Sequence, residues 1–158
     1  KKTKAMQKVT IKPFKVIGIG VRTDNGHGNA EQAIPALWKN FMANGLQSKI
    51  PNKISEEILS LYTNYESDHT KPYDVILGCK VDSLDHIPEG MVGQAFDGGT
   101  YVNHVSKGDM TQGAVINTWL EIWNSNLDRT YTADFEVYGE KAADPTNAEV
   151  DILVAVRD

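Results

Sequence analysis

The chain has 158 residues, of which 41% are hydrophobic and 23% charged, and its formal net charge at pH 7 is −5. This length suits one domain with a sizeable core, and the composition is that of a soluble, by default cytoplasmic, protein without a bilayer-spanning stretch. The negative charge argues against a nucleic-acid-binding surface, and a single cysteine, Cys79, excludes an intrachain disulfide or a thiolate metal cluster.

The N-terminal region predicts a tail followed by a strand. Residues 1–7 are rich in lysine and lack the apolar core of a signal peptide, so we expect a flexible tail. Val9–Thr23 is rich in β-branched residues and predicts one strand. Within it, Gly18 and Gly20 indicate a bend or a close approach of another backbone.

A helix and a hairpin follow in the first half. The spacing of apolar residues predicts a helix over about 30–43, ended by an Asn-Gly pair. The apolar positions recur at i, i+3, i+4 and i+7: Ile34, Leu37, Trp38 and Phe41. Residues 58–66 and 73–81 alternate in polarity around a polar turn, which predicts an antiparallel hairpin. Cys79 falls on the apolar face of the second strand, so we expect a buried small side chain.

The second half repeats this order. After a linker over residues 82–90, a strand-rich segment over 91–105 contains a Gly-Gly break. A helix is predicted over 111–127, and strands over 135–140 and 149–157. The apolar stripe of this helix lies 82 residues after that of the first: Ile116, Trp119, Leu120 and Trp123.

The repeat predicts an α+β fold with pseudo-two-fold symmetry. Two strand-helix-strand-strand units, about 8–83 and 91–158, form antiparallel sheet with two main helices around a central cleft. Each unit has a single apolar face, so both must pack together to complete one domain over residues 8–158. We expect one tryptophan or more to belong to that core.

Glu136 is an acidic residue between two apolar ones in a predicted strand. Because side chains alternate along a strand, Glu136 and Tyr138 share the face opposite their apolar neighbours. In the repeat, Tyr62 corresponds to Glu136 and Asn64 to Tyr138. Two halves that meet along this face would form a groove, with Glu136 on one side and Tyr62 on the other.

These features together resemble the gyrase-inhibitor-like (GyrI-like) small-molecule-binding domain, which also forms the effector-binding part of AraC-type and multidrug-responsive bacterial transcription activators. The resemblance spans roughly residues 8–157. The segments that carry it are Leu37–Phe41, Tyr62–Glu66, Tyr73–Gly78, Trp119–Trp123, Asp134–Tyr138 and Glu149–Ile152.

The resemblance implies a cleft for hydrophobic, often cationic compounds, and Glu136 matches the family's pocket acid. Some free-standing members of the family are hydrolases of cyclopropane-bearing toxins. No segment has the pattern of a helix-turn-helix. The chain is therefore expected to be a free-standing member, or the sensing part of a regulator whose DNA-binding domain is missing or supplied in trans.

The favoured hypothesis is that the protein binds a hydrophobic, cationic small molecule without a cofactor. Glu136 would balance the charge and aromatic rings would form the walls. The expected ligand-binding residues are Glu136, Tyr138, Tyr62, Asn64, Trp38, Trp119, Trp123 and Tyr101. In the alternative enzyme, Glu136 would act as general acid or base, together with Tyr62. The four histidines lack metal-binding spacing, so no metal site is expected.

Overall fold

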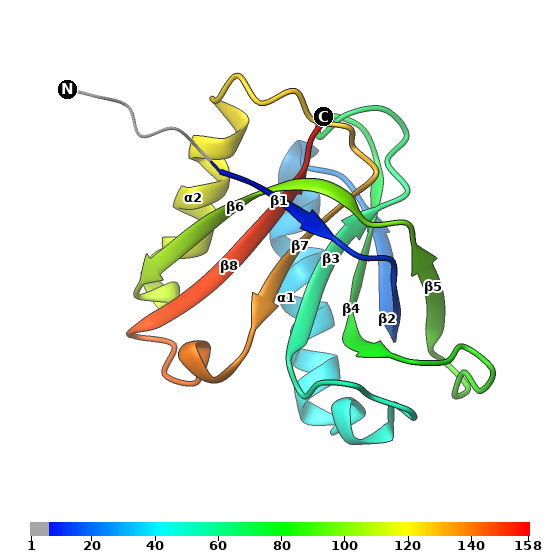
Figure 1. Cartoon of the computed structure of the whole chain (residues 1–158). Coiled ribbons are helices and arrows are strands. Elements are labelled where there is room, and N and C mark those ends of the chain that lie inside the picture. Colours follow the sequence, from blue (N-terminus) through cyan, green and yellow to red (C-terminus); the bar gives the residue numbers. More distant parts are fainter. Residues whose placement is uncertain (1–6) are drawn as a thin grey trace.

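One antiparallel sheet of eight strands carries two helices. The computed structural model describes residues 7–158. In chain order the elements are β1 (Lys8–Ile11), β2 (Phe14–Thr23), α1 (Asn29–Ala43), β3 (Ile58–Thr63), β4 (Tyr73–Val81), β5 (Val92–Phe96), β6 (Gly99–Gly108), α2 (Ala114–Trp123), β7 (Ala133–Tyr138) and β8 (Ala148–Ala155). The strand order is β1-β6-β8-β7-β3-β4-β2-β5, and the sheet is strongly curled (Figure 1). The predicted α+β class is confirmed.

Two segments of the chain each contain two strands, and only the first of them was predicted as a single strand. Lys12 and Pro13 separate β1 from β2, since proline has no N–H to donate to a ladder. Asp97 and Gly98 separate β5 from β6. Gly98 has φ 71°, and a Cβ there would meet the carbonyl oxygen of Ile11 at 2.2 Å. The prediction of one strand over 9–23 is therefore wrong, whereas the predicted break within residues 91–105 is confirmed.

These breaks let the two halves exchange their first strands. β1 leaves the first half and pairs with β6, while β5 leaves the second half and pairs with β2. The halves meet at the middle of the sheet, where β3 pairs with β7. The two ends of the described chain also lie together, because Lys8 Nζ donates to the carbonyl oxygen of Arg157 at 3.3 Å.

Glycines in the left-handed region mark the ends of the helices. α1 begins after Gly28 (φ 74°) and ends before Asn44 and Gly45 (φ 57°), as predicted. α2 begins only after Gly113 (φ 87°), so it is shorter than the helix predicted over 111–127. The residues before Gly113 form a 3-10 turn that the side chain of Asp109 caps.

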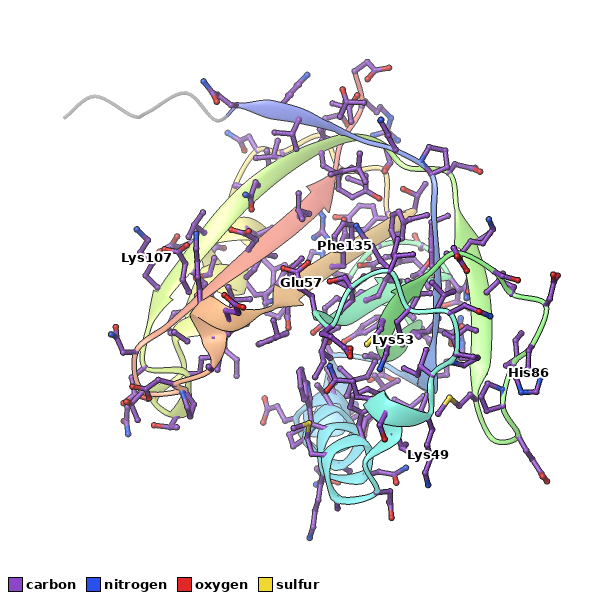
Figure 2. All side chains as sticks on the ribbon, turned by 60° about the horizontal axis from the view of Figure 1, so that its bottom comes forward. Lys49, Lys53, Glu57, His86, Lys107 and Phe135 are labelled. Atoms are coloured by element: carbon purple, nitrogen blue, oxygen red, sulfur yellow. The ribbon has the colours of Figure 1, made fainter. Side chains whose placement is uncertain are left out.

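The alternation of side chains divides the interior into two layers. One face of the sheet closes on itself inside the curl and buries Phe135, whereas Lys107 and His86 project outward (Figure 2). The opposite face carries both helices. There α1 packs on the apolar cluster that contains Cys79, and α2 packs on the apolar cluster that contains Val150. Cys79 is fully buried, as predicted, and burial raises the pKa of its thiol to about 11. Within residues 7–158, no helix has the length and apolar character needed to cross a membrane.

Candidate functional site

A cavity of about 790 Å³ opens on the helix-bearing face, over the central strands. Its volume is in the range that accommodates drug-sized ligands. Residues from α1 and α2 form much of its walls: Ile34, Pro35, Trp38, Val115, Trp119 and Trp123. Side chains of β3, β4 and β7 form its floor, so the cleft depends on both halves of the chain.

Glu136 lies in this floor, 3% exposed, and accepts hydrogen bonds from three neutral donors. The hydroxyl of Tyr62 donates to Oε2 at 2.8 Å, and Nε1 of Trp119 donates to the same oxygen at 2.6 Å. The hydroxyl of Tyr138 donates to Oε1 at 2.6 Å. Both carboxylate oxygens are therefore held in place from β3, α2 and β7.

The charge of this carboxylate has no ionic partner in the part of the chain that the structure describes. No lysine, arginine or histidine of residues 7–158 lies within ion-pair distance of Glu136. Burial raises the pKa of Glu136, and its three hydrogen bonds oppose this shift. The pKa values of Tyr62 and Tyr138 are raised well above their usual range, first by burial and then by Glu136, so both remain proton donors.

Strand register explains why these groups meet. Ser60 lies directly opposite Glu136, and Tyr62 lies opposite Asp134, so the Tyr62 ring reaches Glu136 along a diagonal. Aromatic packing then fixes the rings. Tyr62 lies edge-on to Trp119 with ring centroids 5.4 Å apart, and Trp38 lies edge-on to Tyr138 at 4.8 Å.

An ion pair that the sequence analysis did not identify borders the cavity. Nη2 of Arg129, which lines the cavity, lies 2.9 Å from Oδ2 of Asp134. The hydroxyl of Tyr65 donates to the same Oδ2 at 2.6 Å, and the backbone N–H of Ala155 donates to Oδ1 at 2.8 Å. The Arg129 guanidinium also stacks on the ring of Tyr131 at 4.4 Å. The positive charge of Arg129 is therefore already balanced by Asp134.

A stacked pair links the two sides of the cavity. His69, in the turn between β3 and β4, stacks on Trp123 of α2 with ring centroids 5.6 Å apart and an interplanar angle of 8°. Burial and the charge of Arg129 lower the pKa of His69, which favours its neutral form. Asn25 holds the turn, because its Nδ2 donates to the carbonyl oxygen of His69 at 2.8 Å. The sequence gives no signal for this position, because His69 lies in a turn and has no metal-binding spacing to another histidine.

Six of the eight expected ligand-binding residues line the cavity: Glu136, Tyr138, Tyr62, Trp38, Trp119 and Trp123. Trp119 is also 9% exposed and packs in the core under α2, so it serves as both core and wall.

Asn64 and Tyr101 lie elsewhere, and their assignment to the cleft is wrong. Asn64 follows the end of β3 with φ 50°, and its amide binds Asp74 at 2.8 Å and Gln94 at 3.1 Å. The Asn64 side chain therefore does not lie on the sheet face that carries Tyr138. Tyr101 is 2% exposed and packs against Phe135 inside the curl of the sheet, on the face away from the helices.

Part of the apolar stripe on α2 faces the cavity rather than a core. Ile116 is 60% exposed and Leu120 44% exposed, and both line the cavity. Helical spacing alone gives the same pattern for a stripe that covers a core and for one that borders an open cleft. Among residues 7–158, no group of three or more His, Cys, Asp or Glu side chains is arranged to hold a metal ion.

Comparison with protein families gives a match over nearly the whole chain. The model of a family described as "Cass2: Integron-associated effector binding protein" matches residues 9–156. A relative from Bacillus subtilis (strain 168), named "Putative transcriptional regulator protein YobU", is 30% identical over 144 residues, which cover 89% of this chain and 90% of the relative.

Solved structures share the fold. The integron cassette protein VCH_CASS2 from the mobile metagenome of Vibrio cholerae has 35% identity and a TM-score of 0.73, over 96% of this chain and 95% of its own. The structure of SAV2435 bound to tetraphenylphosphonium has 17% identity and a TM-score of 0.77, over 98% of this chain and 94% of its own. The predicted GyrI-like effector-binding fold is confirmed.

Proposed function

Since this chain belongs to the family of integron-associated effector-binding proteins, we propose that its cleft binds a lipophilic organic cation whose charge Glu136 balances. The observation that carries the proposal is a carboxylate, 3% exposed, at the floor of an aromatic cavity, without an ionic partner in residues 7–158. A buried charge is unfavourable unless it is paired, and a bound cation supplies the missing charge.

The aromatic walls favour a cation with a large apolar body. Rings of Trp38, Tyr62, Trp119, Trp123 and Tyr138 line the cavity. Aromatic faces attract cations through the ring quadrupole, and they also bury the apolar surface that surrounds a charge-delocalised centre. The protein SAV2435, which shares the fold, holds tetraphenylphosphonium. At 17% identity that likeness is one of fold, so the argument rests on the residues of this chain.

The hydrogen bonds on Glu136 favour a cation that does not need to donate one. A carboxylate has about four acceptor positions, and at Glu136 three of them are already occupied by protein donors. A primary ammonium group would bring three N–H donors and find few free acceptors at Glu136. A quaternary or charge-delocalised centre gains the same Coulomb attraction and leaves no donor unpaired.

The test compares tetraphenylphosphonium with tetraphenylborate, an anion of similar shape. All three tryptophans of the chain line the cavity, so intrinsic fluorescence reports binding. We expect the phosphonium to bind saturably and more tightly than the borate. In Glu136→Gln we expect the phosphonium affinity to fall by about tenfold or more, which corresponds to a loss of about 1.4 kcal/mol of binding free energy.

The matched control is Glu121→Gln, which removes an exposed carboxylate on α2 that does not line the cavity. It should bind the phosphonium as the wild type does. Equal phosphonium affinities in Glu136→Gln and Glu121→Gln would contradict the proposal. The alternative, hydrolysis by Glu136 and Tyr62, predicts instead turnover of a cyclopropane-bearing compound that is lost in Glu136→Gln.

A further inference from the structure

A second carboxylate borders the cavity, on the first turn of α1. Glu31 is exposed and lines the cavity together with Ile34, Pro35 and Trp38. These residues follow it at i+3, i+4 and i+7, so they form one stripe along the helix. No lysine, arginine or histidine within residues 7–158 lies within ion-pair distance of Glu31.

Contacts through Tyr138 link Glu136 to the end of this stripe that lies away from Glu31. Trp38 is seven residues beyond Glu31, which corresponds to about 10 Å along a helix axis. Trp38 packs on Tyr138 with ring centroids 4.8 Å apart, and the hydroxyl of Tyr138 donates to Glu136. The Tyr138 side chain thus links Glu136 to the Trp38 end of the stripe, whereas Glu31 stands at its other end.

The other charged groups that line the cavity do not cancel this pair. Arg129 is balanced by Asp134, 2.9 Å away. His69 favours its neutral form, because burial and the charge of Arg129 lower its pKa. The cavity thus has two carboxylates without ionic partners among residues 7–158, one buried in the floor and one exposed at the rim.

We propose that Glu31 is a specificity-determining residue that makes the cleft selective for elongated bis-cations, with one charged centre at Glu136 and the other at Glu31. This inference rests on the proposed function, because it requires that Glu136 hold a cation. The apolar stripe between the carboxylates fits a hydrocarbon spacer whose length matches their separation.

The helix N-terminus explains why an acidic residue is favoured near the start of α1, but it does not explain why Glu31 lies on the cavity side. An acidic residue in the first turn of a helix is favoured by the helix dipole. Gln32 occupies the same turn, is exposed and does not line the cavity. A carboxylate at that neighbouring position would gain the same interaction with the helix and face solvent, so helix stability does not require an acid on the cavity side.

The experiment uses polymethylene bis(trimethylammonium) salts of graded length, from hexamethonium to dodecamethonium, and the mono-quaternary salts with the same chains. Affinities are measured by calorimetry for the full-length chain. We expect the bis-cation to be favoured at an intermediate length, and Glu31→Gln to weaken that bis-cation by about two- to fivefold, as for a solvent-exposed ion pair. The mono-cation should be unaffected, and the effect should fade in high salt.

Glu31→Gln, an exposed and nearly isosteric change, should unfold cooperatively and close to the wild-type temperature, lowered only by the loss of its interaction with the helix dipole, and Glu121→Gln is the matched control for the loss of one charge. If Glu31→Gln weakens the mono- and bis-cations equally, or neither of them, while Glu136→Gln weakens both, the bis-cation inference is overturned and the proposed function stands. If Glu136→Gln affects neither salt, the proposed function itself is wrong.

Discussion

Glu136 combines burial, three hydrogen bonds and the absence of an ionic partner among the described residues. Neutral donors stabilise an anion without cancelling its charge, so the site remains attractive to a cation. The cost of burial appears as a raised pKa. Together these features describe a carboxylate that is oriented before any ligand arrives, which lowers the ordering cost of binding.

At this scale we predict opposite effects of pH on ligand binding and on the stability of the free protein. Cation binding needs ionised Glu136, so affinity for tetraphenylphosphonium should fall as pH falls through its raised pKa. Without ligand, the folded state holds this proton more tightly than the unfolded state. The contribution of Glu136 to stability is therefore full at pH values below its unfolded pKa and is lost as pH rises through the folded pKa.

The measurement is a series of phosphonium titrations and urea unfolding curves between about pH 4 and pH 8, read as the difference between the wild type and Glu136→Gln. The subtraction removes the contribution of other groups, including His69, whose own protonation also repels a cation. If the phosphonium affinity of Glu136→Gln falls toward low pH as it does in the wild type, another residue causes the pH dependence.

The residues of the candidate site could be predicted where they depend on alternation. Glu136, Tyr138 and Tyr62 share a face because they sit at matching positions of extended strands. Asn64 could not be placed by the same reasoning, since the chain turns into the left-handed region at that residue. Arg129 and His69 come from loops, where no period of the sequence indicates the direction of a side chain.

Among the elements, the pairing of β2 with β4 contains a close backbone approach. Gly18 lies opposite Gly78, and a Cβ at Gly18 would meet the carbonyl oxygen of Leu77 at 2.1 Å. A Cβ at Gly78 would meet the carbonyl oxygen of Ile17 at 2.2 Å. The close approach that the sequence indicated near Gly18 is thus confirmed.

We predict that Gly18→Ala destabilises the protein by about 1–3 kcal/mol or more, because two backbones must separate to admit the methyl group. Gly20→Ala is the matched control two residues along the strand, where the nearest atom to an added Cβ is 3.4 Å away. Urea unfolding measures both variants. Similar unfolding midpoints for the two would mean that β2 and β4 separate at little cost.

The type of each main element followed from its apolar period, but several boundaries did not. α1 ends where an Asn-Gly pair predicted it. The split between β1 and β2 depends on where Lys12 and Pro13 direct the chain in space, which the β-forming residues around them do not reveal. The exposed side of α2 could not be predicted either, because Ile116 and Leu120 have the spacing of core residues.

At the scale of the whole molecule, the exchanged strands make the halves interdependent. Each half supplies the edge strand of the other, and β3 and β7 join the halves in the middle of the sheet. The sequence repeat predicted two units with one apolar face each. It could not predict the exchange, because the repeat describes which elements occur and not which strands pair.

We predict that fragments divided within the 82–90 connection do not fold alone and assemble when mixed. Each isolated fragment would lose its edge strand, the β3–β7 ladder and half of the cavity wall. Circular dichroism and tryptophan fluorescence should show no cooperative unfolding transition for either fragment, and phosphonium binding should return in the mixture. A cooperative transition in one isolated fragment would contradict this interdependence.

The contact between Lys8 and Arg157 has a consequence for how this fold can be built into larger proteins. Both ends of the described chain reach the same corner of the sheet, next to β6, and β6 also lies against α2. A second domain attached at either end would therefore leave from one place, whichever order a gene encodes.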